Sequence, residues 1–436
     1  MKWKVLCMAI VFPIAFGHAQ ELGIDEAVRS ALSNQPMLKA AEDQSHASNA
    51  KVDQAKWDRV GRLDTLALYT PNQKTMQADL LGMVVDLNMQ RKYALQATFT
   101  QPLWTWGALS NAHSSAKAMA QASRQNVTRT RQQVAFEARK AYLLAAQASE
   151  AVGVAEQNVD QQNAFLVAAK ARVKSGSAAK LDQLKAELSV SNAESDLSEA
   201  KNRSRIAREA LVTITLDPRF REAKLSRLTI ENTPVPEEEH AVDHARRFRP
   251  DLASLRSQSE ALNFGVKAAR ASGLPVVSFR ASILQQDDKG SNLFGSESPA
   301  TPRDIVKDHR TYQVGLVLSW DTTGPFRVRA KAAELSATGR SVRQLTRAYE
   351  EQIALEVRSA LLNTKEARDR AGVQDNAVVV AEEQARVARL AYKEGLITSV
   401  ELQGAELALT AARFNRLRAH LDAAIARANM SLTLGE

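Results

Sequence analysis

The stretch VAFEARKAYLLAAQASEAVGVAEQNVDQQNAFLVAAKARV (134–173), followed by SGSAAK (175–180), decides the fold of this chain. Small and apolar residues recur along it at alternating steps of four and three, which is the spacing of a heptad repeat. The stripe consists of Val134, Ala138, Ala141, Ala145, Ala148, Val152, Ala155, Val159, Gln162, Leu166, Ala169 and Val173. Beyond the break it resumes as Ala186, Val190, Ala193, Leu197, Ala200, Ser204, Ala207, Leu211 and Ile214. Two such stripes joined by a short turn predict an antiparallel helical hairpin.

The same stripe occurs a second time in the C-terminal half of the chain. It consists of Ile353, Val357, Ala360, Thr364, Ala367, Ala371, Gln374, Val378, Ala381, Ala385, Ala388, Tyr392, Ala405, Leu409, Ala412, Arg416, Ala419, Ala423, Ala426 and Met430. The turn glycines Gly176 and Gly395 lie 219 positions apart. The sequence therefore predicts an internal duplication of one helical hairpin.

A shorter amphipathic helix precedes each hairpin. One is ELGIDEAVRSALSNQPMLKAAEDQ (21–44), with a break near Pro36, and its echo is EEEHAVDHARRFRPDLASLRSQ (237–258). The matching residues Ala241, Val242, Ala245, Pro250 and Leu252 lie 214 positions after Ala27, Val28, Ala31, Pro36 and Leu38. The duplication is thus predicted to include this leading helix.

Between the leading helix and the hairpin, each half carries two stretches in which apolar and polar residues alternate. PVVSFRASIL (275–284), TYQVGLVLSW (311–320) and 93–103 alternate clearly, and 62–70 alternates less cleanly. Stretches of about ten residues with this period are typical of membrane-crossing strands, although a half-buried strand of a soluble sheet has the same pattern. Four strands cannot close a barrel, and lipid does not tolerate an open sheet edge. Strands in a membrane would therefore require the chain to oligomerise.

The N-terminus MKWKVLCMAIVFPIAFGHAQ (1–20) has the plan of a secretory signal peptide, with a cleavage site after Ala19. Lys2 and Lys4 precede an apolar core that is too short to span a bilayer comfortably. The single cysteine, Cys7, lies inside this segment and too early for a lipoprotein cleavage box. We expect a mature chain without cysteine, and hence without disulfides or an acyl anchor.

Composition and motifs narrow the classes of function. The formal net charge is +9, but the basic residues are spread around the helices, so we expect no nucleic-acid binding. His240 and His244 are spaced i, i+4 without a further evident ligand, so we expect a solvated helix start and no metal site. We find no nucleophile elbow, phosphate loop, metalloprotease helix or dinucleotide fingerprint, and we expect neither enzyme activity nor a cofactor.

A leading helix, two strands and a long hairpin, repeated twice behind a signal peptide, resemble the TolC-like outer-membrane efflux proteins. The resemblance covers essentially the whole mature chain. Its more specific parts are RPDL (249–252), QPLWTWG (101–107), the weaker match SWDTTG (319–324), and the turns GSAAKLDQLKAE (176–187) and GLITSVELQGAE (395–406).

The resemblance implies a mainly α fold with a membrane β-barrel portion, in which three protomers build a twelve-stranded barrel and an α-helical periplasmic tunnel. Residues 1–19 would be the signal peptide, 20–216 the first repeat, 217–236 a linker and 237–436 the second repeat. The first repeat would have strands at about 62–70 and 93–103 and a hairpin at 111–216. The second would have strands at about 275–284 and 311–320 and a hairpin at 326–434.

The resemblance also implies a location in the outer membrane of a Gram-negative bacterium, with the helical part in the periplasm. The partners would be two further copies of the chain, outer-membrane lipid, a periplasmic adaptor protein, and an inner-membrane transporter of the resistance-nodulation-division or ABC type. The implied function is a passive exit duct of a tripartite efflux system for drugs, toxic compounds or metal ions. Two alternatives stay open, namely the outer-membrane component of a type I protein secretion system and, ranked last, a secreted coiled-coil scaffold without a pore.

Two acidic residues at the hairpin tips receive a role from the resemblance. Family members commonly have acidic residues that ring the periplasmic entrance, and the matching positions here are Asp182 and Glu401. Three symmetry copies of a carboxylate would attract cations and raise a barrier to anions. One helical turn later, where some members have a second aspartate, this chain has Gly404.

The residues that match the adaptor-contacting region of the family are Gly176, Ser177, Gly395, Leu396 and Thr398. The two glycines also have a purely conformational explanation, because a helix C-terminus favours a residue that tolerates positive φ. The sequence alone leaves both explanations open.

Overall fold

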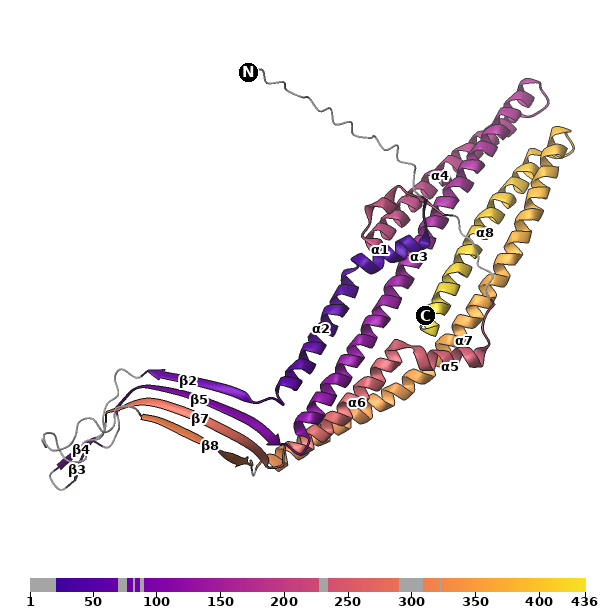
Figure 1. Cartoon of the computed structure of the whole chain (residues 1–436). Helices are drawn as coiled ribbons and strands as arrows, with labels where there is room; N and C mark the ends of the chain where they lie inside the picture. Colours follow the sequence, from indigo (N-terminus) through magenta and orange to yellow (C-terminus); the bar gives the residue numbers. More distant parts are fainter. Residues whose placement is uncertain are drawn as a thin grey trace, which may run out of the picture. The chain divides into compact units, whose positions relative to one another are not determined.

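The computed structural model describes residues 21–69, 77–80, 83–86, 90–226, 234–289, 309–321 and 323–436. The predicted signal peptide (1–19) and part of the predicted linker (217–236) lie outside the described residues. The chain divides into two compact units, whose elements are labelled in Figure 1. The helical unit comprises the residues up to Ala41, Val127–Pro250 and Glu350–Glu436, and the strand unit comprises Glu42–Asn126 and Asp251–Tyr349.

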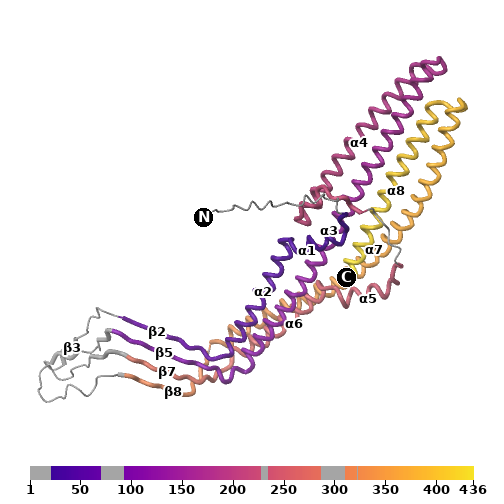
Figure 2. Tube along the Cα trace, turned by 45° about the horizontal axis from the view of Figure 1, so that its top comes forward, coloured from indigo at the N-terminus to yellow at the C-terminus, as the bar shows by residue number. Residues whose placement is uncertain are grey.

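The helical unit contains most of two long antiparallel hairpins, whose first arms begin in the strand unit. In the first, α3 (Ala108–Lys174) turns into α4 (Lys180–Thr215), and in the second, α7 (Gly324–Lys393) turns into α8 (Ser399–Leu434). Figures 1 and 2 both show the two arms of each hairpin side by side. The unit also holds α1 (Ile24–Asn34), α5 (Glu238–Phe248), the short helix η1 (Pro218–Arg221), and β1 (Glu21–Leu22) paired in parallel with β6 (Lys224–Leu225).

The core of each hairpin is its predicted heptad stripe. Ala141, Ala145 and Leu211 belong to one buried cluster of the first hairpin. The second hairpin buries Ala381 and Ala385 against Leu409, and a further cluster is formed by Ala367, Ala371, Ala419 and Ala423. Small side chains let the helix axes approach closely, so alanine dominates these clusters. The prediction was wrong at Arg416, which is exposed and lies with its Nε 3.9 Å from Asp375 Oδ1, because its long charged side chain turns out of the stripe towards water.

Both leading helices break in the same way before a proline. α1 ends at Asn34 and α2 (Pro36–Trp57) follows, just as α5 ends at Phe248 and α6 (Pro250–Ala271) follows. The intervening Gln35 has φ −61° and ψ 120°, and Arg249 has φ −64° and ψ 123°. This extended geometry follows from the clash that a proline ring makes with a preceding helical residue. The matching breaks confirm that the duplication includes the leading helix.

The strand unit contains a four-stranded antiparallel sheet in the order β2-β5-β7-β8. Its strands are β2 (Arg62–Tyr69), β5 (Gln90–Trp104), β7 (Val276–Lys289) and β8 (His309–Ser319), two from each half of the chain. The register aligns Leu63, Phe99, Ala281 and Val314 in one row, and Asp64, Thr98, Ser282 and Gln313 in the next. Because successive rows face opposite sides, the sheet has an apolar and a polar face. A separate hairpin of β3 (Gln77–Leu80) and β4 (Met83–Asp86) completes the described strands.

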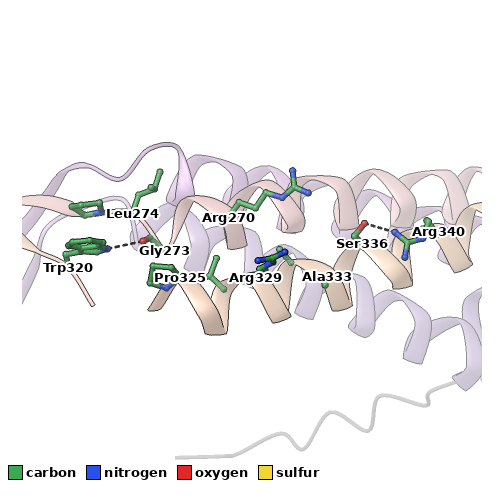
Figure 3. A pocket seen from close by; sticks show the side chains of 12 residues that line it. Arg270, Gly273, Leu274, Trp320, Pro325, Arg329, Ala333, Ser336 and Arg340 are labelled. Atoms are coloured by element: carbon green, nitrogen blue, oxygen red, sulfur yellow. Dashed lines mark hydrogen bonds between the residues drawn. The ribbon is translucent and has the colours of Figure 1, made fainter. Parts of the chain in front are cut away.

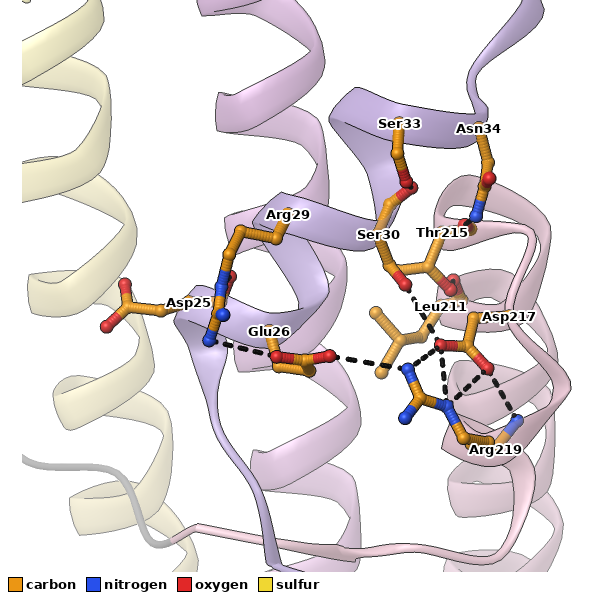
Figure 4. Close-up of polar contacts among 10 residues, drawn as sticks. All are labelled: Asp25, Glu26, Arg29, Ser30, Ser33, Asn34, Leu211, Thr215, Asp217 and Arg219. Carbon is orange, nitrogen blue, oxygen red and sulfur yellow. Dashed lines mark hydrogen bonds and ion pairs between the residues drawn. The ribbon is translucent and has the colours of Figure 1, made fainter.

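A polar cluster fastens α1 to the end of α4 (Figure 4). The Asp217 carboxylate accepts hydrogen bonds from Ser30 Oγ at 2.9 Å and from Arg219 Nη2 at 2.7 Å. Arg219 also lies 3.3 Å from the Glu26 carboxylate. The hydrogen bonds from the Arg219 side chain outweigh burial and lower the pKa of Asp217 to about 2. The cluster therefore holds α1, at the start of the first repeat, against the end of α4, at the end of the same repeat.

The hairpin tips as the candidate functional site

The two hairpin turns have the same backbone geometry. Gly176 has φ +76° and Gly395 has φ +78°, and Ser177 N and Leu396 N donate back to Arg172 O at 2.9 Å and Ala391 O at 2.8 Å. This six-residue closure is a Schellman motif, which needs a left-handed residue at the position of the glycine. The conformational explanation therefore accounts for both glycines, whatever else contacts them.

The second arm of the C-terminal hairpin begins with a capping box. Glu401 N donates to Thr398 Oγ1 at 3.3 Å, and Thr398 N donates to Glu401 Oε2 at 2.7 Å. These hydrogen bonds, first from the Thr398 backbone and then from its hydroxyl, lower the pKa of Glu401. The Glu401 carboxylate is thus ionised and held against the start of its own helix.

Asp182 occupies the equivalent position in the first hairpin but has a different partner. Its capping neighbour is Ala179, whose side chain makes no capping hydrogen bond. The Asp182 carboxylate instead accepts a hydrogen bond of 2.7 Å from Ser399 Oγ, in the first turn of α8. Further along the same helices, Gln403 Nε2 donates to Ser189 Oγ at 3.2 Å. Asp182 therefore joins one hairpin tip to the other, whereas Glu401 does not.

A second connection between the tips involves residues that the sequence analysis did not assign to the site. Arg172 Nη1 donates to Tyr392 O at 3.1 Å, and its guanidinium carbon lies 4.6 Å from the centre of the Tyr392 ring. Phe165 packs on the same ring with a centroid distance of 5.6 Å. A cation above an aromatic face is attracted by the ring quadrupole. The only sequence signal was a basic residue in the last turn of α3, which does not reveal a partner on the other hairpin.

An ion pair lies behind each tip, at equivalent positions of the two repeats. Lys170 Nζ is 3.9 Å from Glu187 Oε1 in the first hairpin. In the second, Arg389 makes a bidentate contact with Glu406 at 2.5 and 2.7 Å, and this contact raises the pKa of Arg389. The Glu406 side chain is only 10% exposed, so water screens this pair less than the looser one. The second tip is therefore braced more strongly.

Exposed apolar side chains surround the turns. Leu396 is 78% exposed at the second turn. Leu181 and Val400 are exposed at equivalent positions in the first turns of α4 and α8, and so are Leu188 and Leu407 further along. Several exposed apolar residues near one end of a molecule are typical of a surface that contacts another protein.

The described residues contain no group of three or more histidine, cysteine, aspartate or glutamate side chains placed to hold a metal ion. His240 Nε2 lies 3.7 Å from Glu237, and the His244 ring packs on Phe248 at 4.6 Å.

In the part of the chain that the structure covers, no helix is long and apolar enough to cross a membrane.

Comparison with known proteins gives a consistent match at the level of sequence family and fold. The sequence model of the Outer membrane efflux protein family matches residues 27–215 and 241–436. No curated protein matches the sequence significantly.

Several solved structures share the fold at low sequence identity. The outer-membrane channel OprN has a TM-score of 0.78 and 18% identity, with 94% of this chain and 89% of that chain covered. VceC from Vibrio cholerae has a TM-score of 0.76 and 17% identity, with 94% and 96% covered. The open-state channel MtrE from Neisseria gonorrhoeae has a TM-score of 0.73 and 17% identity, with 94% and 88% covered. At these identities the likeness shows a shared fold.

Proposed function

The chain belongs to the outer membrane efflux protein family, and we propose that it forms the outer-membrane exit duct of a tripartite efflux system. Its cargo would be small molecules that an inner-membrane transporter, of the resistance-nodulation-division or ABC type, delivers through a periplasmic adaptor. The duct itself is passive, because the transporter supplies the energy. OprN and MtrE are both described as outer-membrane channels, which supports this proposal.

The four-stranded sheet is the observation that carries the proposal. Its apolar face includes Val314, which is 72% exposed, together with the exposed Tyr312, Leu316 and Leu318 on the edge strand β8. Water is a poor solvent for such a face, whereas the acyl chains of a bilayer are a good one. The edges β2 and β8 must then be paired, because lipid cannot satisfy their backbone groups. Three copies joined through β2 and β8 would form a closed twelve-stranded barrel with the polar face inside.

The hairpin tips are the proposed periplasmic gate. Asp182 and Glu401 would face the entrance in three copies each, and Asp182 would also hold the two tips of one protomer together through Ser399. Separation of the tips would break this hydrogen bond and the contact of Arg172 with Tyr392. We propose that adaptor binding favours the separated state, so that opening is a shift between two packings of the same hairpins.

The adaptor would bind the turns themselves. Gly176, Ser177, Gly395, Leu396 and Thr398 form the proposed contact, and the exposure of Leu396 gives it an apolar anchor. The glycines permit the turns, while Leu396 is free to make the contact. This division explains how the same short segments can have both a conformational and a binding role.

Truncation of the anchor tests the proposal. Leu396→Ala should lower efflux, measured as drug susceptibility of a strain that depends on this duct, because the contact loses its apolar side chain. Leu345→Ala is the matched control, since Leu345 is an exposed leucine of the strand unit. Both variants should reach the outer membrane in normal amounts. Equal susceptibility of the Leu396→Ala and wild-type strains would contradict the assignment of the tips to adaptor binding.

A further inference from the structure

All tryptophans of the described chain lie where strands meet helices. Trp57 ends α2, Trp104 ends β5, Trp106 precedes α3, and Trp320 follows β8. Their rings are exposed, but two of them are fixed through the indole N–H. Trp106 Nε1 donates to Pro275 O at 2.7 Å, and Trp320 Nε1 donates to Gly273 O at 3.2 Å. Exposed rings with a satisfied N–H are typical of the interface between a bilayer and water.

A groove opens beside Trp320, between the end of α6 and the start of α7, within the strand unit (Figure 3). Its volume is about 570 Å³. Leu274, Trp320 and Pro325 line the end nearest the strands, and this end is apolar. An apolar wall next to a belt of tryptophans is suited to an acyl chain.

The rest of the groove is positively charged. Arg270 projects from α6, and Arg329 and Arg340 project from α7, while the groove has no acidic residue in its lining. Arg340 Nη1 donates to Ser336 Oγ at 3.0 Å. Within the described residues, neither Arg270 nor Arg329 has an acidic partner.

The acidic residue Asp321, next to Trp320 in the sequence, is already engaged. Its carboxylate accepts hydrogen bonds from Thr323 N at 3.0 Å and from Thr323 Oγ1 at 2.8 Å, and it pairs with Arg327. These hydrogen bonds lower its pKa, so it stays ionised and committed to the start of α7. Among the described residues, Asp321 therefore does not neutralise Arg270 or Arg329.

We propose that this groove binds the phosphodiester headgroup of an anionic phospholipid, with Arg270 and Arg329 holding the phosphate from the two sides. The acyl chain would extend towards the strands along Leu274 and Trp320. This inference rests on the proposed function, because only an outer-membrane location brings phospholipid to this end of the sheet. Guanidinium groups bind phosphate oxygens through paired, charge-assisted hydrogen bonds. The start of α7 adds the positive end of a helix dipole.

A neighbouring copy of the chain is a poorer occupant of the groove. In the proposed barrel, β8 would pair with β2 of the next copy and bring the end of its α2 nearby. Segment 51–59 at the end of α2 contains the basic residues Lys51, Lys56 and Arg59 but only the acidic residues Asp53 and Asp58. A segment with an excess of positive charge does not neutralise two uncompensated arginines.

Native mass spectrometry of the detergent-solubilised protein, exchanged with lipids of defined headgroup, tests the inference. The wild-type protein should retain phosphatidylglycerol in preference to phosphatidylethanolamine. Arg270→Gln and Arg329→Gln should each weaken retention of phosphatidylglycerol about fivefold, as expected for loss of one basic contact to an anionic lipid. Arg347→Gln is the matched control, because Arg347 is an exposed arginine of α7 outside the groove.

The possible outcomes distinguish binding of a phospholipid from binding of free phosphate. They also distinguish failure of the lipid site from failure of the proposed exit duct. Equal retention of both lipids, or unchanged retention in the two groove variants, would overturn the inference while leaving the exit duct intact. Displacement of the lipid by an equal concentration of inorganic phosphate would also overturn it, because the acyl chain would then contribute nothing. A wild-type protein that needs no detergent would overturn both the lipid site and the proposed function.

Discussion

Residues Asp182 and Glu401 occupy equivalent positions in the duplicated hairpin, yet their carboxylates accept hydrogen bonds from different partners. The residue three positions earlier decides the difference. Thr398 gives Glu401 a reciprocal cap, whereas Ala179 offers Asp182 no hydroxyl and leaves its carboxylate to accept from Ser399. The equivalence of the two positions could be predicted from the sequence, but the hydrogen bond from Ser399 to Asp182 could not, because Ser399 comes from the other hairpin.

Loss of the cap should loosen the second tip. Thr398→Ala removes the hydroxyl that satisfies Glu401 N, which costs about 1 kcal/mol at a helix N-terminus. Amide hydrogen exchange in the first turn of α8 should become faster by roughly fivefold as a result. Thr213→Ala is the control, because its exposed hydroxyl only donates back to Glu209 O within α4. Unchanged exchange at residues 399–402 would show that the box does not stabilise the tip.

The Asp217 cluster predicts an acid-dependent weakening of the helical unit. The pKa of Asp217 is about 2 in the folded protein and about 3.9 in an unfolded chain. A lowered pKa stabilises the folded state above the unfolded value, and this contribution disappears as the pH falls from about 4 to about 2. Its size is at most about 2–3 kcal/mol, and less in practice because Arg219 is half exposed to solvent.

Acid unfolding followed by circular dichroism measures this contribution. Asp217→Asn should lower stability near neutral pH and flatten the loss of stability between about pH 4 and pH 2, because the titrating group is gone. Asp196→Asn is the control, since Asp196 is an exposed aspartate of α4. An acid limb of the same steepness in the Asp217→Asn variant would assign the pH dependence to other carboxylates.

Elements were easier to predict than contacts between them. The heptad stripe identified most of the buried residues of both hairpins, because spacing along a helix fixes which side chains share a face. The stripe failed at Arg416, where spacing placed a residue whose long charged side chain instead reaches water. The β3–β4 hairpin had no alternating signal in the sequence. The pairing of Arg172 with Tyr392 was also out of reach, because heptad spacing does not encode how two hairpins align with each other.

Because the helices of each hairpin pack closely, replacement of an alanine in the heptad stripe by a larger residue should lower stability. Ala385 is fully buried against Leu409, so Ala385→Leu would force extra methylene groups into a filled contact and cost roughly 1–3 kcal/mol. Thermal unfolding should show this as a lower midpoint temperature. Ala408→Leu is the matched control, because Ala408 is an exposed residue of α8. If the two variants unfold at the same temperature, the stripe is not the packed core of the hairpin.

The assembly of the molecule into a membrane duct follows from the sheet of the strand unit, which has unpaired edges and an exposed apolar face. A four-stranded sheet with two free edges and an exposed apolar face is incomplete in water and in lipid alike. The alternation of apolar and polar residues in the sequence predicted the apolar and the polar face of the sheet. The family match indicates that the sheet is completed as part of a membrane duct. The family match also argues against a secreted scaffold, while an exit duct for small molecules and a type I secretion component would share the same fold.

The detergent-corrected mass of the mature protein, extracted from outer membranes, decides whether three copies of the chain form a closed membrane barrel. We expect a particle that needs detergent and contains three chains, each slightly lighter than the 47.8 kDa of the full sequence. The barrel closed through β2 and β8 requires that number, because two copies would leave the ring too narrow for a duct. A protein that stays monomeric in buffer without detergent would contradict the barrel, the duct and the gate together.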